Sequence, residues 1–420
     1  MEYQTPAFTK EMMKDYTVLV PDMSPIQFAL FKAALESEGY HRIVLIGSRS
    51  QDVLRLGLKY VHNDTCYPAL LIIGQFLEAL ESGEYDLSHT ALLISQSGGG
   101  CRASNYIHLL RKALWNAGYR TVPVISANVS GLEKDSVMPV TPRLLIKLLT
   151  VCEYGDLIMA LRNETHAYEV HPGDADRMKD KWIERISGWL HENRNVGLFS
   201  YRRVFREITA DFASIELHRV PKVKVGVVGE IYVKFSPAGN NNLLTMLEEQ
   251  DCEVNFPGLM GYVEYSAQNL ILDGTYYGMK PNLANAAKIL IRWLNHVGNT
   301  MSDILREYGF YAPGSFTDLM KKPEGILDLG TKMGEGWLLT AEMIELIEGG
   351  YTNIVCAQPF GCLPNHIAGK GVINKIRERF PDANITPVDY DPSASRVNQE
   401  NRIRLMLAVG KEQLEPSEKQ

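Results

Sequence analysis

Four cysteines lie beside glycine or proline in turn-like stretches, where a thiolate is able to bind a metal or attack a substrate. Cys66 stands in "NDTCYPALL", directly before an apolar helical pattern. Cys101 follows three glycines in "SQSGGGCRASNY", and Cys356 and Cys362 frame the turn in "NIVCAQPFGCLPNH". Each stretch reads as a strand, a turn and a helix, so we expect three strand-to-helix turns to carry the four thiols. Thr65 is the candidate helix cap before Cys66.

The chemistry that these turns fit best is metal binding, and in particular an iron–sulfur cluster. Such a cluster needs thiolate ligands, amide donors to sulfur and a partly dry cleft. Peptide N–H groups at a helix start lower a thiol pKa, and glycines 98–100 let the backbone approach a ligand closely. Considered alone, each cysteine is equally well explained as an inert buried thiol as it is as a metal ligand. Taken together, the four thiols favour a metal site.

Two other readings of the cysteines have less support. A zinc site more often shows paired C-x2-C knuckles, and the sequence contains none. A cysteine nucleophile needs a histidine base, but nothing pairs a particular thiol with the histidines near the motifs, which are His62, His108 and His366. Cys152 and Cys252 sit inside otherwise regular segments, where we expect small buried hydrophobic side chains.

Three further stretches are polar or glycine-rich but carry a weaker signal. The triple-glycine turn lacks the Lys-Ser/Thr of a nucleotide P-loop, and "ILDLGTKMGEGW" is followed by no second phosphate loop, so we expect a helix-entry turn there and no ATP hydrolysis by this chain. Glu230 and Lys234 follow an expected strand, and residues 240–242, all asparagine, are expected to cap the next helix or to line a cleft.

The elements that must position these residues alternate between strand and helix. Short β-branched runs are followed by helical patterns with apolar residues at i, i+3 and i+4, which predicts a parallel sheet covered by helices on both faces. The expected strands lie within residues 16–23, 41–48, 89–97, 121–131, 223–229, 252–258, 353–361 and 384–391. In a doubly wound sheet the functional loops leave the carboxyl ends of the strands, so the cysteine turns are expected at one edge.

The whole chain fits two α/β lobes, each doubly wound and Rossmann-like, with a helical connection and a cleft between them. Its 420 residues are more than one core usually serves. We expect an amino-terminal α/β domain at 1–150, a helical connecting region at 151–220 and a second α/β domain at 221–410. The two halves share a helix-to-strand pattern without a fixed sequence period.

Charge and hydropathy exclude several classes of partner. The formal net charge of −7 argues against nucleic-acid binding, which needs a basic surface. No apolar run is long enough to span a bilayer, and the start of the chain has no signal-peptide pattern, so we expect a cytoplasmic protein.

With these residues in view, the chain resembles the 2-hydroxyacyl-CoA dehydratase superfamily, and within it the activase-related branch. The matching stretches span nearly the whole chain: "NDTCYPA", "GGGCRASNY", "VGEIYVKFSPAGNNNL", "GEGWLLTAEM", "CAQPFGCLPNHIAGKG" and "DYDPSASRVNQENRIRLML". The ATPase activase domain that often accompanies this branch is absent from the sequence. The resemblance therefore implies a separate partner, an ATP-hydrolysing actin-like activase with its own 4Fe-4S cluster. The resemblance is also compatible with a homodimer, and no residue pattern in this sequence establishes whether one forms.

The resemblance also implies a cofactor and a ligand set. A 4Fe-4S cluster would lie between the lobes on Cys66, Cys101 and Cys362, with Cys356 as a fourth ligand or with one iron left open. Residues of the same turns are expected to contact the cofactor: Gly99, Gly100, Arg102 and Gly361. In family dehydratases the cluster receives a low-potential electron and passes it to a thioester, which then expels a hydroxyl. The substrate of this chain stays undefined.

Two alternatives stay open from the sequence. A related branch carries an 8Fe-9S double-cubane cluster on six cysteines and reduces small molecules; this chain has six cysteines in all, but Cys152 and Cys252 lack the loop context of ligands. Ligation by four cysteines would close the cluster, which suits a non-catalytic electron carrier or cluster scaffold better than a dehydratase or reductase.

Overall fold

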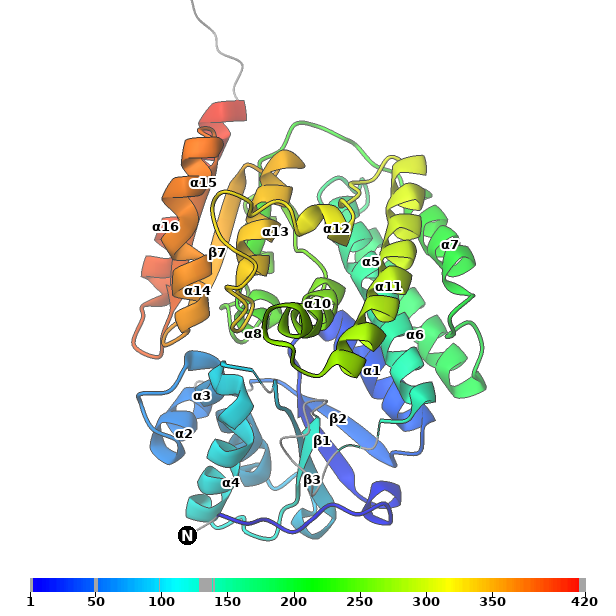
Figure 1. The fold of residues 1–420 in the computed structure, drawn as a ribbon, viewed down its shortest axis with the longest axis vertical. Helices are drawn as coiled ribbons and strands as arrows, with labels where there is room; N and C mark the ends of the chain where they lie inside the picture. The colour runs from blue at the N-terminus through cyan, green and yellow to red at the C-terminus, as the bar shows by residue number, and fades with distance from the viewer. Residues whose placement is uncertain (1–2, 49–51, 98, 128–137, 139, 415–420) are drawn as a thin grey trace, which may run out of the picture.

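The computed structural model describes residues 3–48, 52–97, 99–127, 138 and 140–414, and it is an α/β protein with two four-stranded parallel sheets (Figure 1). The first sheet has the strand order β2-β1-β3-β4. Its strands are β1 (Thr17–Pro21), β2 (Arg42–Ile46), β3 (Thr90–Ser95) and β4 (Val124–Ala127). All four lie where the β-branched runs predict them.

Helices cover this first sheet and follow its strands in the predicted alternation. They are α1 (Pro25–Ser37), α2 (Asp52–Tyr60), α3 (Tyr67–Glu81) and α4 (Tyr106–Ala117), with short 3-10 turns η1 (Met12–Lys14), η2 (Leu87–His89) and η3 (Arg102–Asn105). Helix α3 is buried along almost its whole length because it packs in the core beneath the neighbouring elements. This explains why its sequence is apolar on all sides rather than on one stripe.

The second sheet repeats the topology of the first, with the order β6-β5-β7-β8. Its strands are β5 (Lys224–Gly229), β6 (Glu253–Asn255), β7 (Asn353–Pro359) and β8 (Asn384–Tyr390). In both sheets the first strand lies between the second and the third, so each has one switch point in its winding. The expectation that the two halves share an architecture is therefore confirmed, although their sequences show no fixed period.

The helices of the second half fall into two groups. One group winds around the sheet: α8 (Ile231–Phe235), α9 (Leu243–Glu248), α13 (Trp337–Glu348), α14 (Leu363–Ala368), η4 (Lys370–Val372), α15 (Ile373–Arg379) and α16 (Arg396–Leu414). The other group is inserted between β6 and β7: α10 (Met260–Tyr277), α11 (Pro281–Glu307) and α12 (Phe316–Leu319).

The helices between the two sheets are α5 (Pro142–His166), α6 (Asp174–Glu192) and α7 (Tyr201–Ala213), so the predicted boundary between 150 and 151 falls inside α5. The core of this helical region includes Trp182 and Phe205 together with Leu30 of α1 and Leu305 of α11. Helix α5 also contacts β6 and α10. The connecting helices therefore pack against elements of both halves (Figure 1).

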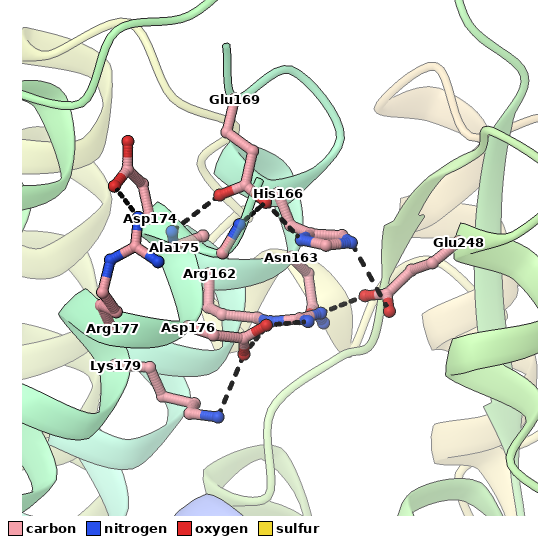
Figure 2. Close-up of polar contacts among 11 residues, drawn as sticks. Arg162, Asn163, His166, Glu169, Asp174, Ala175, Asp176, Arg177, Lys179 and Glu248 are labelled. Atoms are coloured by element: carbon pink, nitrogen blue, oxygen red, sulfur yellow. Dashed lines mark hydrogen bonds and ion pairs between the residues drawn. The ribbon is translucent and has the colours of Figure 1, made fainter. Parts of the chain in front are cut away.

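A partly buried charge network fastens this helical region to the second half (Figure 2). Arg162 of α5 donates from Nε and Nη2 to the two carboxylate oxygens of Asp176 on α6, at 3.0 and 2.9 Å. Its Nη1 donates to Glu248 of α9. His166, one turn further along α5, lies between Glu169 and Glu248. One guanidinium thus holds carboxylates from two other helices, which suits the planar fork of arginine.

One continuous hydrophobic core includes side chains of both sheets, among them Leu19 and Leu92 of the first and Val227 and Val355 of the second. In the described part of the chain, no helix is both long and apolar enough to cross a membrane.

Candidate functional site

The turns at the carboxyl ends of the two sheets pack directly against each other. Tyr67 at the start of α3 donates its N–H to the carbonyl of Phe360 after β7, at 3.0 Å. Tyr232 of α8 donates its hydroxyl to Gln75 of α3, at 3.1 Å. In Figure 1, α14 of the second half lies next to α3 of the first half. This is the edge at which a doubly wound sheet binds its ligands.

Two of the predicted glycines lie at this close approach. Gly361 has φ +73°, and a methyl group there would lie 3.2 Å from Cα of Cys66 and 3.2 Å from Nη1 of Arg102. A methyl group at Gly100 would lie 2.4 Å from Sδ of Met333. Both positions are where a turn of one half meets the other half. Gly99 has open space around it, so its lack of a side chain has no steric reason among the described atoms.

Arg102 ties two of the cysteine turns together. Its Nη1 donates to the carbonyl of Asp64 at 2.8 Å, which joins the turn that carries Cys101 to the turn that carries Cys66. A methyl group at Gly361 would lie 3.2 Å from the same Nη1, so the guanidinium stands beside the turn that leads to Cys362. Arg102 therefore joins two of the turns and lies beside the third, and its positive charge opposes the rise that burial causes in the pKa of Cys66.

Three cysteines begin helices at this edge. Cys66, 5% exposed, is the N-cap of α3; Cys101 is the N-cap of η3; and Cys362, 8% exposed, is the N-cap of α14. The Sγ of Cys101 accepts a hydrogen bond from the N–H of Ala103, at 3.5 Å. The prediction that Thr65 caps α3 is wrong, because the helix begins at Tyr67 and the cap position falls on the cysteine itself.

The three thiols are close enough for charge on one to act on another. Burial raises the pKa of Cys101 to about 12, and negative charge at Glu335, Glu230 and Cys66 adds to the effect. Burial likewise raises the pKa of Cys362, with contributions from Glu335, Glu230 and Cys101. Such thiols are neutral near pH 7 unless a metal or another cation stabilises the thiolate.

Two carboxyl groups complete this buried set. Glu230 follows β5 and caps α8, accepting a hydrogen bond from the N–H of Val233 at 2.9 Å. Glu335 precedes α13 and accepts one from the N–H of Ile231 at 3.0 Å. Burial, followed by the charge of Glu335, raises the pKa of Glu230 to about 8. Burial also raises the pKa of Glu335.

Sequence reasoning missed two members of this site, Glu335 and Tyr106. Glu335 lies between two glycines in a helix-entry turn, and that flanking was an available signal. The Tyr106 hydroxyl forms a 2.8 Å hydrogen bond with Sγ of Cys66. Because Tyr106 occupies the apolar stripe of its helix, its sequence context is that of an ordinary core residue.

Cys356 does not lie with the other three cysteines. It was predicted in a turn, and this is wrong: β7 continues to Pro359 and places Cys356 in the middle of the strand, fully buried. Val355 and Ala357 face one hydrophobic core and Ile354 and Cys356 face another, on the opposite side of the sheet. The nearest polar side-chain contact of the thiol is Oδ1 of Asn365, at 3.9 Å.

Cys152 and Cys252 are both 2% exposed, as expected for small buried side chains. Cys152 lies on α5, and Cys252 lies just before β6, where its Sγ approaches the carbonyl of Gln250 at 3.7 Å. Neither side chain lies in the turns that carry the other thiols.

The site was also tested for ligands to a single metal ion. No three His, Cys, Asp or Glu side chains of the described residues are grouped closely enough to hold one. A cluster is a different case, because its thiolates bind separate irons at the corners of a cube and therefore stand further apart than the ligands of one ion. Comparison of the chain with protein-family models and with curated proteins gave no match.

Proposed function

We propose that this chain binds a 4Fe-4S cluster through Cys66, Cys101 and Cys362, between two α/β lobes. One observation supports it most: three thiols from three separate turns meet at the carboxyl ends of two sheets with the same topology. The donors fit the group, because each thiol starts a helix, where N–H groups favour negative charge on sulfur. Gly361 and Gly100 lie where these turns approach each other closely.

When bound, such a cluster would accept and pass on single electrons at low potential. The chain's own residues would hold the ligands in place and supply protons. Arg102 joins the turns of Cys66 and Cys101 and lies beside the turn that leads to Cys362. Glu230 and Glu335 lie beside the thiols, and burial together with the charge of Glu335 raises the pKa of Glu230 to about 8, so this carboxyl retains a proton near pH 7. That proton would be available to a substrate or to a departing hydroxyl.

The arrangement favours an enzyme over a closed electron carrier. Three thiolates leave one iron without a cysteine ligand. Cys356 is not available as a fourth, because it faces the hydrophobic core on one face of the second sheet. We therefore propose reductive or radical chemistry on a small substrate, of the 2-hydroxyacyl-CoA dehydratase type. The double-cubane alternative has less support, because Cys152 and Cys252 are buried away from these turns.

An ATP-hydrolysing activase is the proposed electron donor, and the surface beside the site suits a protein partner. Four apolar side chains next to the cysteine turns are at least 46% exposed, which are Met333, Phe360, Leu363 and Ile367. Exposed apolar groups gathered at one place commonly mark a protein-binding surface.

The first experiment measures iron and acid-labile sulfide per chain, on protein purified without oxygen, together with the EPR spectrum of the reduced form. About four of each, with a single-cluster signal, is expected. Cys66→Ala, Cys101→Ala and Cys362→Ala should each lose most of the iron, whereas Cys252→Ala, the control, should retain it. Reconstituted wild-type protein without iron would refute the proposal, and about eight irons would replace it with the double cubane.

A further inference from the structure

A cavity lined by acidic and apolar side chains lies away from the cysteine turns, at the carboxyl end of β6. It has a volume of about 140 Å³ and is enclosed by α5, α10, α11, α13 and the segments that follow β6 and α11. That is about ten times the space needed for one water molecule. The end of a parallel strand, enclosed by helices, is a common position for a small-molecule site.

Five carboxyl groups line this cavity, which are Glu153, Asp156, Glu264, Glu342 and Glu345. None of the described lining residues is Lys, Arg or His. Asp156 accepts hydrogen bonds from Gln27 and from the N–H groups of Leu259 and Met260. Glu342 pairs with Lys234 at 3.3 Å, and Glu345 accepts from the N–H of Gly314 at 3.0 Å. Three of the five are thus held by partners in the chain.

The other two carboxyls have no partner among the described residues. Glu153, 3% exposed, lines the cavity from α5 without a hydrogen bond or ion pair, and Glu264 does so from α10. A third group is also unsatisfied: Oδ1 of Asn295, on α11, is buried without a hydrogen-bond partner. A carboxylate only accepts hydrogen bonds, and burying one unpaired is costly. These groups together favour a cationic ligand that donates hydrogen bonds.

The side chains that line the cavity favour an organic cation over a metal ion. No three carboxyls of the described chain converge on one point, as a metal ion would require. Much of the lining is instead apolar, including Leu157, Phe256, Met260 and Phe316. A hydrocarbon stem would bury against such side chains, while its ammonium groups reach carboxyls on different helices.

We propose that this cavity binds a small organic ammonium compound, with Glu153 and Glu264 as its ion-pair partners and Asn295 as a further acceptor. The site is separate from the cysteine turns. The edge of the acidic cavity nevertheless approaches the cysteine turns, because Gly258 and Glu342 also line a small neighbouring cavity that reaches Glu335. The proposal does not depend on the presence of a cluster.

The test is calorimetric titration of the full chain with 1,4-diaminobutane, with butylamine, 1-butanol and Mg²⁺ as comparisons. We expect saturable binding of the diamine, weaker binding of the monoamine and none of the alcohol. Glu153→Gln and Glu264→Gln should each weaken diamine binding at least tenfold. The matched control is Glu184→Gln, an exposed glutamate on α6, which should leave binding unchanged.

A second variant avoids the charge change. Gly298 on α11 lines the cavity and has open space where a Cβ would stand, so Gly298→Met should fill the site without disturbing the helix. Gly188→Met, at an open helical position outside the cavity, is its control. Diamine binding should disappear in the first and persist in the second. The proposal is overturned if wild-type protein does not bind the diamine, if all these variants bind it equally, if 1-butanol binds equally well, or if Mg²⁺ displaces it.

Discussion

At the scale of single residues, the secondary structure around a cysteine decides whether its thiol is available to bind a metal. Cys356 and Cys362 are six residues apart, yet one faces the interior of the second sheet and the other starts a helix at its edge. Cys356→Ala should therefore retain the full iron content and the EPR signal, whereas Cys362→Ala should lose both. The measurement is iron per chain after anaerobic reconstitution. Equal loss in both variants would make Cys356 a ligand and would require β7 to rearrange on cluster binding.

Gly361 provides a test of the close approach between turns. Gly361→Ala adds a methyl group at positive φ and places it 3.2 Å from Cys66 and Arg102. We expect a loss of about 2 kcal/mol in the free energy of unfolding, and a lower cluster content as the turns separate. The matched control is Gly83→Ala, which has φ +75° and open space around it. It carries the same backbone strain, of about 1 kcal/mol, without the contact. Identical effects of the two variants would show that the contact is unimportant.

At the scale of elements, sequence reasoning predicted the strands well and the site in part. Short β-branched runs indicate β1 to β8, because strands of a parallel sheet covered on both faces are apolar along most of their length. Turn chemistry also indicates Cys66, Cys101 and Cys362. It does not reveal where a strand ends, and this is why Cys356 was expected in a turn. Glu335 and Tyr106 join the site through contacts between distant segments, which local sequence does not encode.

The connecting helices depend on Arg162, which pairs with carboxylates on α6 and α9 (Figure 2). Arg162→Met would leave Glu248 and Asp176 facing each other without the guanidinium. The pair with Glu248 is largely buried and the pair with Asp176 is partly exposed, so we expect the free energy of unfolding to fall by about 2 kcal/mol, between the cost of breaking a buried pair and that of breaking an exposed one. Arg206→Met is the control, because Arg206 and Glu307 form an exposed pair that should contribute less than about 1 kcal/mol. Urea denaturation followed by circular dichroism measures both. A loss no larger than that of the control would show that the network does not fasten α5.

At the scale of the whole molecule, the buried carboxyls should make the protein more stable in mild acid than in mild alkali. Burial raises the pKa of Glu264 to about 8 and that of Glu345 to about 7, from an ordinary value of 4.5. Burial raises the pKa of Glu153 and Glu342 as well. Between about pH 4.5 and 8 the unfolded chain therefore binds fewer protons than the folded chain. By linkage, the free energy of unfolding falls as pH rises through this window.

Glu230 and Asp22, whose pKa values burial raises to about 8 and about 6, act in the same direction, whereas two other shifted groups act outside that range. The pKa of Asp176 is lowered by its hydrogen bonds with Arg162, so its contribution is lost only in strong acid, and the raised pKa of Cys101, about 12, matters in alkali. Urea denaturation at pH 5.5, 7.0 and 8.5 should thus show a steady decline, and Glu264→Gln should reduce that decline by about 2 kcal/mol. Glu184→Gln, on the surface, should leave the slope unchanged. Saturating 1,4-diaminobutane should flatten the wild-type slope, because an ammonium beside Glu264 stabilises its ionised form. A decline that neither Glu264→Gln nor the diamine alters would locate the titrating groups elsewhere and would separate the stability of the protein from its acidic cavity.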